Sequence, residues 1–355
     1  MQYLIMFYFS MIRITMSDTS HRWLSAFYSF YNPDKHKIDD LGYTSKILFS
    51  MRSVILVISF QAAVIAALLS YIAGMFNPAY SLLLIVGLVF AHAASNLTND
   101  YFGYVREHDT PESPRRKYTI HPIADGFLSK RQVKGLIALF IAIDVLIGLF
   151  FTYVHGFGVL AFIIAGAALM IFYDATPITL KQVGLGEIAS FLVWGPLMIA
   201  GGFYALTGQL SANAFLVSIP YGLGVMSILL GKHIDQLEFD RSKGHNTLPV
   251  ILGTKNARIL NSVLIALMYI LVPLFVLLNV ISVFALLVFL NFPRAVKAIR
   301  VFLEPRPKAP PKGYVGWPLW YHKYSLLNNR NFGWFYISGL LIGILFYLAF
   351  GHIVL

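Results

Sequence analysis

Long apolar stretches, separated by loops of two opposite kinds, constrain this chain more than any other feature. A membrane-spanning helix needs about 20 mainly apolar residues, and somewhat shorter stretches are tolerated. The composition agrees, because 58% of the residues are hydrophobic and only 12% are charged. We therefore predict an all-α membrane protein, a bundle of nine transmembrane helices with cytoplasmic cap loops and helices. The nine stretches are residues 53–75, 81–99, 133–154, 157–173, 186–207, 213–231, 258–276, 278–293 and 332–352.

The positively charged residues are confined to alternate loops. All 27 Lys and Arg residues lie at one end of the predicted bundle, before the first stretch or around the connections that follow the second, fourth, sixth and eighth. Cytoplasmic loops collect Lys and Arg, which accounts for the formal net charge of +11 without a nucleic-acid partner. We predict a multi-pass protein of the cell membrane with a cytoplasmic N-terminus and an external C-terminus.

The chain divides into two unequal parts. Residues 1–45 are predicted to form an N-terminal cytoplasmic or interfacial segment, and residues 46–355 the nine-helix transmembrane domain. Met1–Met16 is mainly apolar with Arg13 inside it, which suits either an interfacial helix or a true start at Met16. The chain has no Cys, so disulfides, thiolate metal sites and cysteine nucleophiles are excluded.

Acidic residues follow the second apolar stretch directly. Asn99-Asp100 ends the stretch, and Glu107 and Asp109 come shortly afterwards. If the helix continues past Asp100, positions 100, 103 and 107 share one face. Carboxylates at a membrane boundary are costly unless they have partners, so this group is a candidate functional site.

A second acidic group follows the sixth apolar stretch. Asp235, Glu238 and Asp240 lie within six residues, close to several basic residues. Even-numbered stretches end on the same side of the membrane, so the two acidic groups are expected to lie close together. Solvated loops whose mixed charges end the helices would explain either group alone, whereas the matching positions of both favour a shared site.

Two carboxylate clusters that meet across a helical bundle repel each other unless cations lie between them. Mg²⁺ prefers carboxylate, water and phosphate oxygens, so we predict a Mg²⁺ site that also binds a lipid diphosphate. The candidate metal ligands are Asp100, Asp109, Asp235 and Asp240, and with Glu107 they form the candidate catalytic set. The candidate diphosphate-binding residues are Asn99, Arg106, Arg116, Lys117, Lys181, Arg241 and Lys243.

Both groups resemble the motifs of the UbiA superfamily of intramembrane prenyltransferases, and most closely those of its dihydroxynaphthoate (menaquinone biosynthesis) branch. The first family motif is Asn-Asp-x-x-Asp with further acids, and the second is Asp-x-x-x-Asp followed by Gly and a Thr-Leu run. The matching residues are Asn99-Asp100 with Glu107 and Asp109, then Asp240, Gly244 and Thr247-Leu248. The resemblance covers about residues 46–350, and the nine-span layout also fits the family.

Two further stretches add to the resemblance, and three positions depart from it. His121-Pro-Ile-Ala-Asp-Gly126 is similar to an Arg-Pro-Ile stretch of the family, and Gly184-Leu-Gly-Glu187 to its loop between spans four and five. The second Asp of the first motif is Gly103, the first Asp of the second motif falls on Gln236, and the Arg of the Arg-Pro-Ile stretch is His121. We expect Asp235, Glu238 and Glu107 to take over the missing ligand roles.

The resemblance implies a reaction as well as a fold. It implies Mg²⁺-dependent transfer of a prenyl group from an isoprenyl diphosphate to an aromatic, quinone-precursor-type or lipid acceptor within the membrane. In the family's mechanism, Mg²⁺ and basic residues stabilise the departing diphosphate, and an electron-rich ring attacks the allylic carbocation. The apolar interior holds the prenyl tail and keeps water from the cation.

Two other functions remain open from the sequence alone. A membrane terpene cyclase on the same scaffold would ionise a diphosphate without an acceptor, and the altered motifs are compatible with that reaction. A transporter would place ionisable residues near the middle of the bilayer, where only Asp144 lies. Asp144 is either functional or a protonated hydrogen-bond donor to a neighbouring helix, and it is not in the candidate catalytic set.

Overall fold

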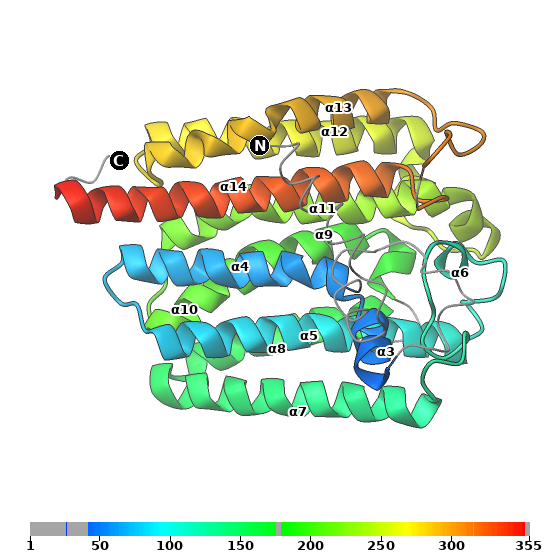
Figure 1. Cartoon of the computed structure of the whole chain (residues 1–355), viewed down its shortest axis with the longest axis horizontal. Helices are drawn as coiled ribbons and strands as arrows, with labels where there is room; N and C mark the ends of the chain where they lie inside the picture. The colour runs from blue at the N-terminus through cyan, green and yellow to red at the C-terminus, as the bar shows by residue number, and fades with distance from the viewer. Residues whose placement is uncertain (1–25, 27–41, 175–178, 315, 352–355) are drawn as a thin grey trace.

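The computed structural model describes residue 26 and residues 42–174, 179–314 and 316–351, so most of the predicted segment 1–45 lies outside the described residues. The described chain is all helical, as predicted, and contains no strand (Figure 1). Its elements are α3 (Tyr43–Ser50), α4 (Ser53–Ile72), α5 (Pro78–Val105), α6 (Pro114–Tyr118), α7 (Lys130–His155), α8 (Phe157–Asp174), η3 (Leu180–Val183), α9 (Gly186–Leu192), η4 (Val193–Ala200), α10 (Gly201–Thr207), α11 (Ala212–Ser242), α12 (Leu248–Leu277), η5 (Val283–Asn291), α13 (Phe292–Leu303) and α14 (Tyr321–Phe350).

Seven helical runs among the described residues are long and apolar enough to cross a membrane: α4, α5, α7, the run from α9 to α10, α11, α12 and α14. Helix α8 is apolar but shorter. The stretch predicted at 278–293 is instead the short 3₁₀ helix η5, which leads into the amphipathic α13 with its exposed Arg294, Lys297 and Arg300. The predicted count of nine transmembrane helices is therefore not confirmed, although η5 and α13 run back alongside α12 (Figure 1).

Glycine and proline shape the fifth apolar stretch. The backbone from Val193 to Ala200 is a π-helix that contains Pro196, whose missing N–H cannot join the regular α-helical ladder. At Gly195 this segment approaches α11 so closely that an added Cβ would lie 3.2 Å from the Cα of Gly222. The Gly-Pro pair thus interrupts the helix and also brings α9 and η4 against α11.

Buried polar residues bind the C-terminal helices together. The Tyr269 hydroxyl donates to Asn328 Oδ1 at 2.9 Å, and Asn291 Nδ2 donates to Tyr269 Oη at 2.9 Å. Asn261 Nδ2 donates to the Ser227 carbonyl at 3.0 Å. Hydrogen bonds between helices satisfy polar groups that the bilayer cannot solvate, so these contacts fix how α11, α12 and α14 pack.

The loops of interest lie at one end of the bundle. Helices α5 and α11 both end there, close to α6 and its loop (Figure 1). The loop after α6 is folded by Asp125, which accepts a hydrogen bond from Arg116 and another from the His121 N–H, both at 2.8 Å. Gly126 closes the turn with a φ of +77°. This end of the molecule therefore has an ordered cap rather than a set of free loops.

Candidate active site

The two acidic groups meet at this end of the bundle through their histidines. The rings of His108 and His245 pack edge to face with centroids 5.3 Å apart. The η3 segment joins them, because Gln182 Nε2 lies 3.0 Å from His245 Nε2 and the Gln182 carbonyl accepts the Asn246 N–H at 2.9 Å. The expected proximity of the loops after α5 and α11 is therefore confirmed.

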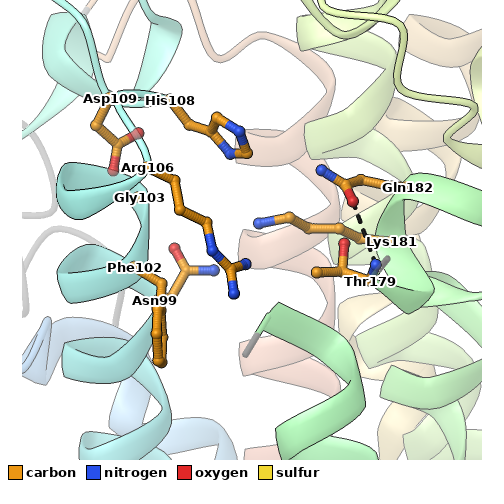
Figure 2. Close-up of a pocket in the computed structure, with 9 residues that line it drawn as sticks. All are labelled: Asn99, Phe102, Gly103, Arg106, His108, Asp109, Thr179, Lys181 and Gln182. Carbon is orange, nitrogen blue, oxygen red and sulfur yellow. Dashed lines mark hydrogen bonds between the residues drawn. The ribbon is translucent and has the colours of Figure 1, made fainter. Parts of the chain in front are cut away.

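A pocket lies between α5 and η3. Arg106 and Lys181 extend from its opposite walls toward the space between them, and Asp109 and His108 lie at one end (Figure 2). Its lining residues are Asn99, Phe102, Gly103, Arg106, His108, Asp109, Thr179, Lys181 and Gln182. Facing cations from two separate elements leave a positively charged gap that suits an anion with several oxygens.

The pKa values of His108, in the pocket wall, and of His245, which packs against it, reflect the same positive charge. Burial, together with the neighbouring His108, Lys181 and Lys243, lowers the pKa of His245 to about 4. Burial and Lys181 also lower the pKa of His108, although Asp109 opposes them. Both imidazoles are therefore neutral at pH 7, and the positive charge at the pocket comes from lysine and arginine side chains.

Asp109 occupies the space beside Gly103. A Cβ built on Gly103 would overlap the Asp109 carboxylate, so the glycine makes room for that side chain. Asp109 Oδ2 also lies 3.2 Å from His121 Nε2. Because His121 Nδ1 accepts backbone N–H groups from residues 123 and 124, its hydrogen is on Nε2, which donates to Asp109.

Asp100 is held by two arginines. Arg115 donates to both of its oxygens, at 2.8 Å and 2.7 Å, and Arg52 donates to Oδ1 as well. The Asp100 side chain is fully buried. Asp100, Asp109 and His121 nevertheless each offer a ligand atom, and these atoms all lie within 4.8 Å of one another, so a buried Asp-rich cluster is present.

The carboxylates of the second group have different surroundings. Asp235 accepts the backbone N–H groups of Tyr321 and His322 at 3.1 Å and 3.0 Å, which fastens α11 to the start of α14. Asp240 is buried, and its only described side-chain hydrogen bond is a long one, 3.4 Å, from the Thr247 hydroxyl. Asp240 therefore accepts fewer and longer hydrogen bonds than Asp235 does.

Comparison with known proteins decides the family. The sequence matches the model of the UbiA prenyltransferase family over residues 60–327. The chain belongs to this family. It is 27% identical to the 1,4-dihydroxy-2-naphthoate octaprenyltransferase of Bacillus subtilis over 68% of this chain and 78% of the relative. It is also 27% identical to the Escherichia coli enzyme of the same name, over 74% of this chain and 86% of the relative.

Solved structures share the fold. A UbiA homolog from Aeropyrum pernix K1 superposes with a TM-score of 0.62 at 20% identity, over 82% of this chain and 98% of the other. A UbiA homolog from Archaeoglobus fulgidus, bound to GPP and Mg²⁺, superposes with a TM-score of 0.55 at 14% identity, over 83% and 99%. The protein is therefore an integral, multi-pass membrane enzyme, a prenyltransferase of the UbiA family, as the sequence motifs predicted.

In this UbiA-family enzyme, four of the predicted site residues line the pocket: Asn99, Arg106, Asp109 and Lys181. The other predicted residues do not line it: Asp100, Glu107, Arg116, Lys117, Asp235, Asp240, Arg241 and Lys243. Arg116 is paired with Asp125, while Lys117 and Lys243 are exposed. Glu107 is exposed in a left-handed turn, with a φ of +57°.

Glu238, expected to replace a missing ligand, lies on the outer surface. Its side chain is 81% exposed and forms a 3.4 Å ion pair with Arg241, which is 53% exposed. Asp144 lies partly buried on α7, near Gly87 of α5, and is not among the residues that line the pocket. Neither position supports a ligand role in the pocket.

Several residues of the site were not predicted from the sequence. Thr179 and Gln182 line the pocket but carry no charge, so no acidic or basic pattern marks them. Glu187 and His233 form a buried pair with Oε1 and Nδ1 2.8 Å apart. The Gly184-Leu-Gly-Glu187 stretch was the one signal for Glu187, because it resembles a family loop.

Proposed function

We propose that this enzyme transfers a prenyl group from an isoprenyl diphosphate to a hydroxylated aromatic ring of the quinone-precursor type, within the membrane. The observation that carries the proposal is the pair of facing cations, Arg106 and Lys181, across a pocket that also contains Asp109 (Figure 2). An isoprenyl diphosphate combines a multiply charged head with an apolar tail, which suits a charged pocket at the end of an apolar bundle. The naphthoate octaprenyltransferases among the relatives support an aromatic acceptor.

The oxygen ligands of the pocket fit Mg²⁺. Asp109 and the side-chain oxygen of Asn99 are hard ligands within the pocket wall, and Asp240 is a buried carboxylate with one long hydrogen bond. We assign the metal to Asp109 and Asp240, assisted by Asn99. Asp100 and Asp235 already accept strong hydrogen bonds and are assigned structural roles. A Mg²⁺ ion held by these residues would supply positive charge that offsets the charge of a diphosphate.

The side chains of the pocket have separate tasks in this mechanism. Arg106 and Lys181 donate to the phosphate oxygens and stabilise the charge that grows as the C–O bond breaks. Arg106 is kept in place by its contact with the Phe102 ring, whose centroid is 4.8 Å from the guanidinium carbon. His108 and His245 stay neutral and do not add to the positive charge. The apolar helices below exclude water from the allylic cation.

We also propose that the pocket faces the cytoplasm, with the N-terminus on the same side. The Lys and Arg residues gather at the pocket end of the bundle, which is the pattern of cytoplasmic loops. A cysteine introduced into the α6 loop and labelled in sealed cells or inverted vesicles tests this orientation. Labelling only in inverted vesicles is expected, and labelling in intact cells would contradict it.

The function is tested by product analysis. Purified protein is given Mg²⁺, prenyl diphosphates of several lengths and a panel of hydroxylated aromatic acids, with and without EDTA. We expect a prenylated acceptor that depends on Mg²⁺ and that falls by about 10²–10³-fold in Arg106→Gln and Lys181→Gln. Arg241→Gln is the matched control, because Arg241 is exposed in the last turn of α11 and does not line the pocket, and it should retain activity. A cyclised hydrocarbon formed without any acceptor would contradict the proposal.

A further inference from the structure

Glu187 and His233 form a buried acid–base pair that the proposed diphosphate chemistry does not use. Glu187 lies in the first turn of α9 and His233 on α11, and their side chains meet with Oε1 2.8 Å from Nδ1. Glu187 is 0% exposed and His233 only 3% exposed. With Glu187 ionised, its oxygen accepts the hydrogen bond, so Nδ1 carries the hydrogen and the lone pair on Nε2 points away from Glu187.

The position of His233 on α11 directs it away from α14. Gly231 packs against the backbone of His322 in α14, and Asp235 caps the same helix, so these two positions mark the face toward α14. At about 100° per residue, His233 lies about 200° from Gly231. The same rule puts His233 within about 20° of Asp240, seven residues later. His233 therefore shares the face of α11 that carries Asp240.

Electrostatics and chain connectivity tie the pair to the pocket. His233 lies close enough to His245 to be among the groups that influence its pKa, and His245 packs on His108 at the pocket. Glu187 follows η3 directly, and η3 supplies Lys181 and Gln182 to the pocket wall. Glu187 Oε2 is also buried and has no hydrogen-bond partner among the described residues. A buried carboxylate oxygen left open in this way is expected where a second ligand binds.

We propose that His233, oriented by Glu187, accepts the proton that the aromatic acceptor loses during prenyl transfer. This inference rests on the proposed function. The bond between the allylic carbon and the diphosphate oxygen breaks, and its electron pair leaves on the diphosphate. The allylic carbon bonds to the ring, the ring C–H bond breaks, and its electron pair restores aromaticity. The proton moves to Nε2 of His233, and the Glu187 carboxylate stabilises the imidazolium.

A purely structural pair would explain the contact less well. Burying an ionisable pair costs desolvation that its attraction repays poorly, so an apolar contact would join α9 and α11 at least as stably. The hydrogen bond does select one tautomer of His233, which is what a general base needs. The arrangement also leaves the imidazolium beside a carboxylate at the moment when the proton arrives.

The test separates release of the diphosphate from formation of the product. His233→Asn keeps a donor near the position of Nδ1 but removes Nε2, so the hydrogen bond to Glu187 survives. We expect diphosphate release to continue, with the allylic carbon captured by water as a prenyl alcohol, while the prenylated product falls by about 10²-fold or more. An acceptor deuterated at the reacting carbon should then react more slowly than its unlabelled form. Imidazole added to His233→Ala should restore product.

His155→Asn is the matched control. His155 also uses Nδ1, 2.7 Å from the Ala205 carbonyl, but it lies at the C-terminal end of α7, distant in sequence from the pocket. It should keep the native ratio of product to diphosphate. A native ratio in a folded His233→Asn variant would overturn the inference, and so would the absence of imidazole rescue in His233→Ala. If the native enzyme forms no product from any acceptor, the proposed function fails instead.

Discussion

The two acidic segments, residues 99–109 at the end of α5 and in the loop after it and residues 235–240 at the end of α11, each contain one carboxylate that is held by the protein and one that is less engaged. In the first segment Asp100 is bound by Arg52 and Arg115, whereas Asp109 has a 3.2 Å contact with His121. In the second segment Asp235 caps α14, whereas Asp240 has a single 3.4 Å hydrogen bond from Thr247 among the described residues. Under the proposed assignment, the two acidic segments divide structural and ligand roles in the same way.

The two segments differ in what compensates the structural carboxylate. Asp100 depends on two largely buried guanidinium charges, while Asp235 depends mainly on backbone N–H groups at a helix start, with Arg306 3.9 Å away. Removing Asp100 leaves full charges without a partner, whereas removing Asp235 leaves two uncharged amides without an acceptor, which costs less. Acidic residues near a membrane boundary thus cannot be counted as metal ligands until their partners are known.

The largest expected effect is on stability, at Asp100. Asp100→Ala should lower the free energy of unfolding by about 3–5 kcal/mol, because it leaves Arg52 and Arg115 buried without a counter-charge. Thermal or denaturant unfolding in detergent micelles measures this. Asp109→Ala, nine residues later in the same acidic segment, is the control and should change stability far less. Equal stability of the two variants would remove the distinction between a structural and a ligand carboxylate.

The next effect is on activity, at Asp109 and Asp240. Asp109→Asn and Asp240→Asn should each lower product formation by about 10²–10³-fold, because each loses a charged ligand for the metal and diphosphate, with little change in melting temperature. Initial rates measured over a range of Mg²⁺ concentrations give the size of the loss. Glu238→Gln, on an exposed face of α11 close to Asp240, should behave like the native enzyme. Full activity in Asp109→Asn would contradict the assignment.

A smaller effect on stability is expected at Asp235. Asp235→Ala removes the acceptor for two N–H groups at the start of α14, and the expected loss is about 1–3 kcal/mol in the free energy of unfolding. Hydrogen exchange should show faster opening of the first turn of α14 than of α5. If exchange accelerates equally in both helices, Asp235 is not a local cap.

The smallest expected effect is a change in the pH dependence of folding stability when His245 is replaced. Burial and neighbouring charges lower the pKa of folded His245 to about 4, so between pH 6.5 and 4 the unfolded chain binds more protons at this position than the folded chain. The contribution of this group to stability is therefore present above pH 6.5 and is lost as the pH falls toward 4. In His245→Gln, the melting temperature should fall less steeply over this range. An unchanged slope would contradict the shift.

Local sequence patterns were sufficient for part of the site. Apolar stretches located the long helices, and the shared side of even-numbered stretches brought the loops around Asp100 and Asp240 together. Asn99, Arg106, Asp109 and Lys181 were predicted and do line the pocket. These successes depend on features that lie within one segment or on the order of the segments.

The remaining features depend on contacts between distant segments. Arg52 pairs with Asp100 across 48 positions, and Asp235 caps α14 across 86 positions, so no local pattern marks either contact. The η5 segment is as apolar as a spanning helix but only nine residues long, because Ser282 begins it and the basic, amphipathic α13 follows. Hydrophobicity alone could not separate it from a transmembrane helix.

The contact between Gly103 and Asp109 has a consequence for motif searches. An aspartate at position 103 would require the Asp109 carboxylate, the end of a flexible side chain, to move out of the space that it fills. In this chain a carboxylate thus reaches that space from position 109 instead of from position 103, six residues earlier. A motif search that demands an acid at position 103 would then discard chains that keep the same charge in the same place.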